Sequence, residues 1–199
     1  MLNRREMLLG GLAVLATPAL AQRPSVRTAA ALIAAARAQV GVTMTYDPAY
    51  SRIRFPGGDV DRTRGVCTDV IVRAYRDAFG LDLQALVNAD MRAGFSAYPK
   101  RWGLSQPDSN IDHRRVPNLQ VFLERAGAKL LVPDAALTWQ PGDIFTSLIN
   151  NRLPHIGIVS DRVAGGRPLV IHNIGAGARE EDALTLHAVT GRYRWGLEG

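Results

Sequence analysis

The sequence contains a single cysteine, Cys67, among its 199 residues. One cysteine excludes an internal disulfide framework, and no Cys-x-x-Cys or His-x-x-x-His spacing gives a metal-binding signature. Phosphate-cradling glycine loops are lacking too, because Gly165-Gly166 and Gly175-Ala176-Gly177 fall in expected turns with no helix after them. The sequence has no internal repeat, low-complexity tract or interdomain linker. These absences predict one domain that uses no cofactor.

Residues 1–21 have the three parts of a secretory signal. Two adjacent arginines form the charged start, an apolar run covers residues 7–16, and Ala19-Leu20-Ala21 is a small-residue cleavage site. The arginine pair resembles a twin-arginine signal, and a general secretory signal explains it nearly as well. The apolar run is shorter than the roughly 20 residues of a membrane-spanning helix. We therefore expect residues 22–199 to form a periplasmic or secreted protein with no stable membrane insertion.

The charge of the expected mature protein is positive. Removing the signal leaves 22 basic and 17 acidic residues, a net charge of +5. An exported protein does not normally meet nucleic acid, and the basic residues are scattered rather than run together. We expect an anionic wall polymer or another envelope substrate as the partner. A simply solvated surface explains the charge equally well.

Hydrophobic spacing predicts helices in the first part of the chain and strands in the second. The expected helices cover residues 25–40, with Ser25 as the N-cap, and residues 67–79, 81–93 and 116–126. The expected strands cover residues 143–149, 155–160, 168–173 and 192–195. This order predicts an α+β fold in which N-terminal helices pack on a C-terminal antiparallel sheet.

A long irregular segment, residues 41–65, separates the first two expected helices. Long loops in compact domains are often functional. Tyr46 and Tyr50 in this segment are candidate substrate contacts that line a cleft. The alternative is that both tyrosines only anchor the loop on the core.

Cys67 begins the second expected helix and lies on its apolar stripe, and Gly80 ends that helix. An odd cysteine in an exported protein suggests a free, reactive thiol. The N-terminal dipole and unpaired N–H groups of a helix favour the thiolate over the thiol. Cys67 is therefore the candidate nucleophile. Such a nucleophile needs a base, usually histidine, and a third group that orients the base.

His155 and His172 are the candidate partners of Cys67, because they flank a turn-like segment and so predict an antiparallel hairpin. In a symmetric register they face each other, with Cβ atoms about 4.5–5.5 Å apart. Asn173 is the alternative third residue, since successive strand residues face opposite sides and only one can point at His155. Gly157 would leave room for a helix end or a substrate.

Two other readings of the polar residues stay open. A zinc site of Cys67, Asp69, His155 and His172 is the rival to catalysis, but no short ligand spacing supports it, so we expect no metal.

In Asp112-His113-Arg114-Arg115, an arginine could clamp a substrate carboxylate. The slightly favoured alternative is that both arginines pair with Asp112 or cap the helix after them. The triplet Lys100-Arg101-Trp102 could contact glycan, although such surface triplets are common.

The order of these motifs resembles two related families. A cysteine opening a helix, then Pro141-Gly142-Asp143-Ile144, His155-Ile156-Gly157-Ile158-Val159 and Ile171-His172-Asn173, is similar to the NlpC-type cell-wall cysteine peptidases of the papain-like clan. Segments 65–71 and 110–119, together with these later ones, resemble the bacterial DUF1287 family over about residues 30–194. The resemblance implies a papain-like fold with Cys67 as nucleophile, His155 as base and His172 as third polar residue.

The sequence departs from the NlpC pattern around the nucleophile. Typical members have Asp before the cysteine and Ser-Gly after it, and these groups help to hold a free amine of the substrate. Here the flanking residues are Val66 and Thr68-Asp69. Asp69 stays a candidate substrate contact, but it lies about 200° around the helix from the cysteine and is not a direct replacement.

From these features we expect an exported cysteine peptidase or amidase of the cell envelope. Its substrate would be an amide bond, with peptidoglycan peptides as the leading candidate, cleaved through a thioester on Cys67. The alternatives are an acyltransferase or transpeptidase on the same fold, and a non-catalytic envelope-binding module.

Overall fold

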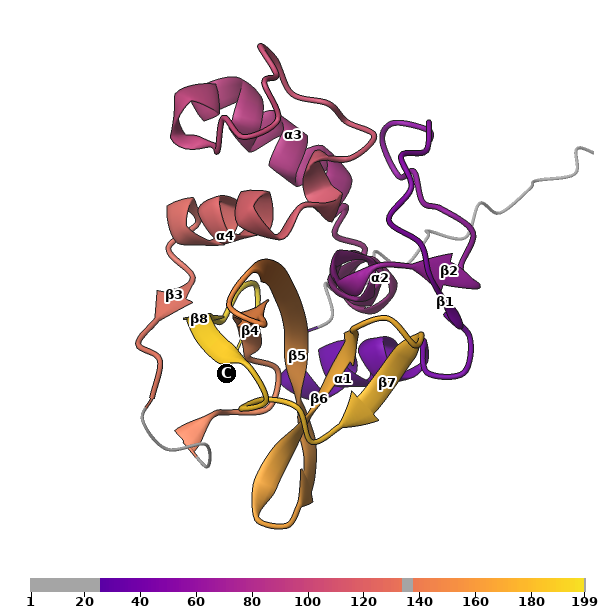
Figure 1. Cartoon of the computed structure of the whole chain (residues 1–199), viewed down its shortest axis with the longest axis vertical. Coiled ribbons are helices and arrows are strands. Elements are labelled where there is room, and N and C mark those ends of the chain that lie inside the picture. The colour runs from indigo at the N-terminus through magenta and orange to yellow at the C-terminus, as the bar shows by residue number, and fades with distance from the viewer. Residues whose placement is uncertain (1–25, 134–137, 199) are drawn as a thin grey trace, which may run out of the picture.

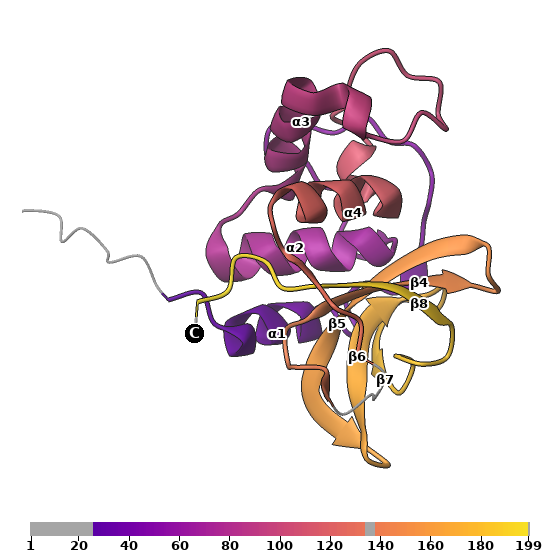
Figure 2. The same ribbon diagram turned by 90° about the vertical axis from the view of Figure 1, so that its left-hand side faces the viewer.

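The computed structural model describes residues 26–133 and 138–198. The expected signal segment and the Ser25 cap lie outside the described residues. Within them, helices from the first two thirds of the chain pack on an antiparallel sheet built from the last third (Figures 1 and 2). This confirms the α+β prediction. No helix in the described ranges is both long and apolar enough to cross a membrane.

The helices follow the predicted pattern closely. They are α1 (Ala29–Arg37), α2 (Cys67–Phe79), α3 (Leu83–Gly94) and α4 (Val116–Arg125), with short 3₁₀ helices η1 (Phe95–Ala97) and η2 (Asp112–Arg114). Thr28 caps α1, because its Oγ1 accepts the Ala31 N–H at 3.2 Å. Gly80 ends α2 in a left-handed conformation with φ 68°.

The main sheet has the strand order β3-β8-β4-β5-β6-β7 over the described residues. The strands are β3 (Lys129–Leu130), β4 (Ile144–Ile149), β5 (Leu153–Ala164), β6 (Arg167–Asn173), β7 (Ala178–Glu181) and β8 (Ala188–Tyr193). A separate parallel pair joins β1 (Thr45–Tyr46) to β2 (Arg64–Gly65). The last strand therefore begins and ends earlier than predicted, and β1, β2, β3 and β7 were not predicted. These four strands are too short to show a periodic pattern.

The two faces of the sheet have different neighbours. Ile156 and Ile158 of β5 belong to the main core, together with Val70 of α2 and Leu32 of α1. On the other face, Phe145, Val159 and Val170 pack in a smaller cluster with Trp139, Ala183 and Leu184. Burying an aliphatic side chain of this size contributes about 1.5–3 kcal/mol. The helix α2 is therefore held on β5 by a large apolar contact, which fixes where its first residue lies.

The β5–β6 hairpin is not symmetric, which corrects the predicted register. Between the pairs Val159–Val170 and Val163–Pro168, β5 advances by four residues and β6 by two. This bulge carries two extra residues on β5. Continuing the ladder past the Ile158–Ile171 pair brings Gly157, not His155, opposite His172. The shift is even, so both histidines still lie on the same face of the sheet.

Gly157 has a different role from the predicted one. A Cβ atom on this residue would lie 2.5 Å from Cε1 of Phe145 and 3.0 Å from Cβ of His172. The space is therefore filled by the Phe145 ring and by His172, and neither a helix end nor a substrate occupies it. Close packing at Gly157 brings Phe145 against both histidine rings, with centroid separations of 6.0 Å to His155 and 6.5 Å to His172.

Substitution Gly157→Ala tests this packing. We expect it to lower the free energy of unfolding by about 1–3 kcal/mol, because the added methyl overpacks a site bounded by two strands. Urea unfolding measures the change. Gly94→Ala is the control, since its Cβ would meet the end of the flexible Arg125 side chain. Equal effects of the two substitutions would contradict the assigned packing.

Candidate active site

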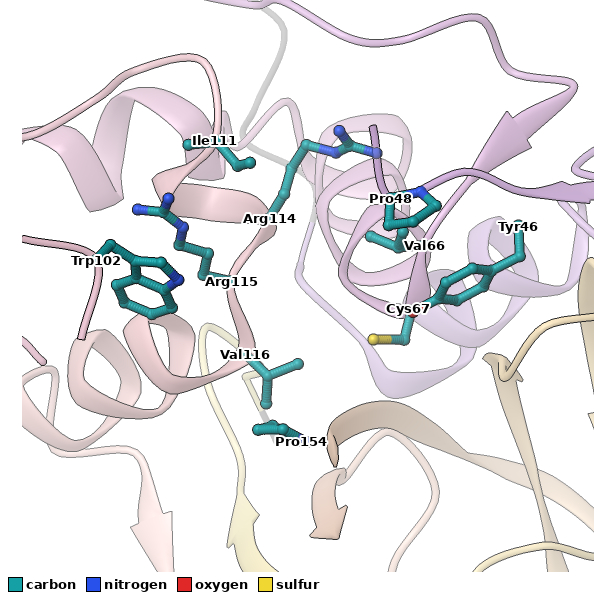
Figure 3. A pocket seen from close by; sticks show the side chains of 10 residues that line it. All are labelled: Tyr46, Pro48, Val66, Cys67, Trp102, Ile111, Arg114, Arg115, Val116 and Pro154. Atoms are coloured by element: carbon teal, nitrogen blue, oxygen red, sulfur yellow. The ribbon is translucent and has the colours of Figure 1, made fainter. Parts of the chain in front are cut away.

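The Cys67 side chain lies at the first position of α2 and points into a pocket of about 270 Å³. Figure 3 shows the sulfur directed into this pocket, with Tyr46 on the near side and Trp102 and Arg115 on the far wall. The lining residues are Tyr46, Pro48, Val66, Cys67, Trp102, Ile111, Arg114, Arg115, Val116 and Pro154. Cys67 itself is 4% exposed. The thiol thus belongs to a free, buried cysteine on the floor of the pocket.

His155 lies beside this pocket on β5. The residue before it, Pro154, lines the pocket, and the backbone N–H of the residue after it, Ile156, points to the Cys67 sulfur. His155 is thus next to the pocket along β5, and its ring lies on the face of the sheet that carries Phe145 and His172. In the described chain the thiol makes no hydrogen bond to an imidazole. Catalytic hydrogen bonds are often loose without substrate and tighten in the complex.

His155 is the first member of a buried hydrogen-bonded chain. Its Nε2 lies 2.8 Å from Nδ1 of His172, and Nε2 of His172 lies 3.0 Å from Oε1 of Glu181 on β7. A carboxylate only accepts, so His172 carries its hydrogen on Nε2. Its Nδ1 is then an acceptor, and Nε2 of His155 is the donor to it. This assigns the unprotonated ring nitrogen of His155 to Nδ1.

Burial favours the neutral forms of the Cys67 thiol and of the two imidazoles. It raises the pKa of the Cys67 thiol to about 12, against the N–H groups of Ile156 and Thr68, which favour the thiolate. Burial also lowers the pKa of His155 to about 3 and lowers the pKa of His172, where Glu181 opposes it. The expectation of a helix-start thiolate is therefore wrong for the resting protein: the dipole acts in the predicted direction, but desolvation is larger.

The alternative third residue, Asn173, points to the other side of β6. Its Nδ2 donates to the backbone carbonyl of Gly65 at 3.0 Å, two residues before the nucleophile. Only His172 meets His155, as the alternation of strand residues predicts. Asn173 instead fixes the segment that leads into α2.

Asp69 and Arg114 form a buried two-point ion pair, which corrects two predicted roles. Arg114 Nε and Nη2 each lie 2.9 Å from a carboxylate oxygen of Asp69. Asp69 also accepts the N–H of Val66 at 2.6 Å, and Arg114 donates to the carbonyls of Asp47 and Ala49. Both side chains are therefore already occupied. Neither is free to bind substrate, and the partner of Arg114 is not Asp112.

The rest of the polar cluster divides into two buried residues and one that lines the pocket. Asp112 accepts from Arg115 at 2.9 Å, which is the favoured pairing for that arginine alone, and from the Asp108 N–H at 2.6 Å. His113 is buried outside the pocket, and burial lowers its pKa to about 4. Neither Asp112 nor His113 reaches the site as a substrate contact. Arg115 does, and its guanidinium stacks 4.1 Å from the centre of the Trp102 ring.

The two tyrosines of the long loop also differ in their position relative to the pocket. Tyr46 lines the pocket beside Cys67, and burial raises its pKa to about 12, so it is a neutral phenol. Tyr50 lies outside the pocket, where its hydroxyl donates to Asp108 at 3.1 Å and accepts from Asn110 at 3.0 Å. These hydrogen bonds anchor the loop, which is the alternative role that the sequence left open for Tyr50.

The described residues contain no group of three or more His, Cys, Asp or Glu side chains that could hold a metal ion. Of the four ligands in the zinc interpretation, Asp69 is held by Arg114 and the two histidines are bonded to each other. The arrangement has the parts of a thiol–imidazole site.

Comparison with known proteins identifies the family. The family described as "Domain of unknown function (DUF1287)" matches residues 33–195, so this chain belongs to it. A protein of Escherichia coli (strain K12), described as uncharacterized protein YijF, is 51% identical over 161 residues, which is 80% of this chain and 78% of that protein. The resemblance to the DUF1287 family is thereby confirmed. The matched range includes Cys67, His155, His172 and Glu181.

Two functional features were missed by sequence reasoning. Glu181 completes the histidine chain, and it lies two residues beyond Arg179, the partner of His172 in the β6–β7 ladder. A strand at residues 178–181 would have revealed it, but the polar run Arg179-Glu180-Glu181-Asp182 has no apolar alternation. The Asp69–Arg114 pair was missed because no local spacing relates residues 45 positions apart.

The Asp69–Arg114 pair can be tested by its energy. We expect Arg114→Met to lower the free energy of unfolding by about 3–5 kcal/mol, because it leaves a buried carboxylate without its partner. Arg62→Met is the matched control: Arg62 also forms a two-point pair, with Asp77, but at the surface, and we expect a loss under about 1 kcal/mol. Urea unfolding of both variants decides, and a small effect at Arg114 would contradict the assigned role.

Proposed function

We propose that this protein is an exported thiol hydrolase that cleaves amide bonds in the bacterial cell envelope, with peptidoglycan peptides as the leading substrate. The observation that carries the proposal is the free Cys67 thiol on the floor of a pocket beside the bonded chain His155–His172–Glu181. A nucleophile, a base with a free ring nitrogen and an orienting acid on the far side are the parts that acyl transfer requires.

The hydrogen-bonded chain supports His155 as the base. Glu181 fixes the hydrogen of His172 on Nε2, and His172 in turn fixes the hydrogen of His155 on Nε2. Nδ1 of His155 is therefore the nitrogen that receives the thiol proton. The carboxylate also stabilises the positive charge that this proton brings to the histidine pair.

The reaction then proceeds from neutral partners. The Cys67 sulfur attacks the amide carbonyl as its proton passes to Nδ1 of His155, and the backbone N–H of Cys67 is a candidate donor to the oxyanion. The imidazolium protonates the departing amine as the C–N bond breaks, which leaves a thioester. Water, deprotonated by His155, attacks the thioester, and the proton returns to the thiol with release of the acid. Each step conserves the protons of the site.

A papain-like fold of the NlpC type is part of this proposal. A helix that begins with the nucleophile and packs on an antiparallel sheet carrying the base supports it, as does the order of the motifs. Export through the segment at residues 1–21 supplies the location in which such a hydrolase meets the wall. The departure from the NlpC pattern at Val66 and Asp69 means that recognition of a free amine is not part of the proposal.

The direct test is digestion of purified peptidoglycan by residues 22–199. We expect soluble peptides in the mass spectrum from the intact protein and at least about 10⁴-fold less from Cys67→Ala, since the nucleophile is indispensable. Tyr50→Phe is the control and should keep wild-type activity, because Tyr50 lies outside the pocket. Equal release of soluble peptides by Cys67→Ala would contradict the mechanism. Products that form only with an added amine would indicate a transferase, and binding without release would indicate a non-catalytic module.

The pH dependence of activity tests the neutral resting site. Because the pKa of His155 is lowered to about 3, the base stays unprotonated as the pH falls from 7 to 5, and we expect kcat/KM to change by less than about twofold. A histidine with its usual pKa near 6.5 would lose about thirtyfold over this range. Circular dichroism at each pH controls for unfolding. An acid limb centred between pH 6 and 7 would show that the base has the usual pKa of a histidine and would contradict the assigned effect of burial on His155.

A further inference from the structure

A second hollow continues the site beyond Pro154. It measures about 310 Å³ and is lined by Pro99, Arg101, Pro117, Gln120, Ser147, Leu148, Pro154 and Thr190. Pro154 also lines the Cys67 pocket, and two pairs of adjacent residues, Arg101-Trp102 and Val116-Pro117, place one member in each hollow. The two hollows therefore lie side by side along the same segments. Together these two neighbouring hollows are called here the Pro154 groove.

The charges in the Pro154 groove have one sign. Its lining contains Arg101, Arg114 and Arg115 and no aspartate or glutamate. Arg114 is neutralised by Asp69. Arg115 uses Nη1 on Asp112, and its other guanidinium nitrogens form no further hydrogen bond in the described ranges. Arg101 is exposed and contacts the Trp102 ring, with no ion pair among the described residues.

Both Arg101 and Arg115 lie against the ring of Trp102. The guanidinium carbon of Arg115 lies over the Trp102 ring, 4.1 Å from its centre, and that of Arg101 lies 5.8 Å from the centre of the same ring. Stacking on an aromatic ring holds a guanidinium in a fixed plane and leaves its N–H edge available. A fixed, planar N–H edge matches the two oxygens of a carboxylate. Trp102 thus links the two arginines on one wall of the groove.

We propose that the Pro154 groove selects substrates with a free carboxylate, which Arg101 and Arg115 bind beside Trp102. The inference rests on the proposed hydrolase function and names its substrate class: acidic wall peptides. A free amine finds no acceptor of opposite charge here, because Asp69 is held by Arg114 and no other acid reaches the lining. The carboxylate contact orients the peptide, and the amide is cut at Cys67.

Binding to the non-cleaving Cys67→Ala protein provides the test. The probes are a synthetic peptidoglycan stem tetrapeptide with its carboxylates free and the same peptide with those carboxylates converted to carboxamides. We expect calorimetry to give a Kd at least about tenfold lower for the free acid, since charge-assisted hydrogen bonds are lost in the amide. Adding Arg101→Gln or Arg115→Gln should remove most of that difference. Arg101→Gln carries the test without risk to folding, because Arg101 is exposed and unpaired in the described chain.

The matched control is Arg167→Gln, which removes one positive charge at the distant tip of the β5–β6 hairpin, where Arg167 pairs with Asp182 at the surface (Figure 1). This change should leave the preference intact. Equal binding of the two peptides, or an equal loss with Arg167→Gln, overturns the inference. Inorganic phosphate that binds more tightly than the acidic peptide also overturns it, in favour of a phosphate ligand.

Turnover by the wild-type protein distinguishes a failure of this inference from a failure of the proposed function. Cleavage of both peptides with equal kcat/KM would leave the hydrolase standing and overturn carboxylate selection. Carboxylate-selective binding by Cys67→Ala with no turnover by the wild type would support the groove and count against the hydrolase.

Discussion

The buried ion pair between Asp69 and Arg114 is the contact on which the site depends. It joins the first turn of α2, the η2 segment and the loop at Asp47 and Ala49 through one carboxylate and one guanidinium. The same carboxylate holds the Val66 N–H just before the nucleophile. Because a buried charge without its partner is costly, these three segments have one stable arrangement. The position of the thiol relative to the pocket wall follows from that arrangement.

Burial of the site also determines the protonation of its thiol and imidazole. In water a thiol and an imidazole titrate near neutral pH, but burial moves the pKa of Cys67 up and that of His155 down. The resting pair is therefore neutral, and in the proposed mechanism proton transfer accompanies attack on the carbonyl. The side chain of Glu181 is 38% exposed and so is in contact with solvent. The negative charge that fixes the tautomers thus stays outside the buried centre, where its desolvation cost is small.

The sequence was sufficient for everything that depends on local pattern. The four helices, the cysteine at a helix start, and the hairpin that carries both histidines follow from periodicity and turn residues, and the structure confirms each of them. The functions assigned to single polar residues were less predictable. Asp69, Asp112, His113, Arg114 and Tyr50 each bond to a residue of the protein or are buried away from the pocket. Whether a charged side chain meets substrate or another side chain depends on contacts between distant segments, which spacing along the chain does not encode.

The bulge in the β5–β6 hairpin separates the histidines from the turn beyond it. Beyond the bulge, residues 163–167 are exposed. Related chains are therefore free to vary the length of this tip. Between Gly157 and the bulge, by contrast, length changes must come in twos, since a single added residue would turn one imidazole to the opposite face. Natural variation in the hairpin should therefore concentrate at its tip, with only even changes between the histidines and the bulge.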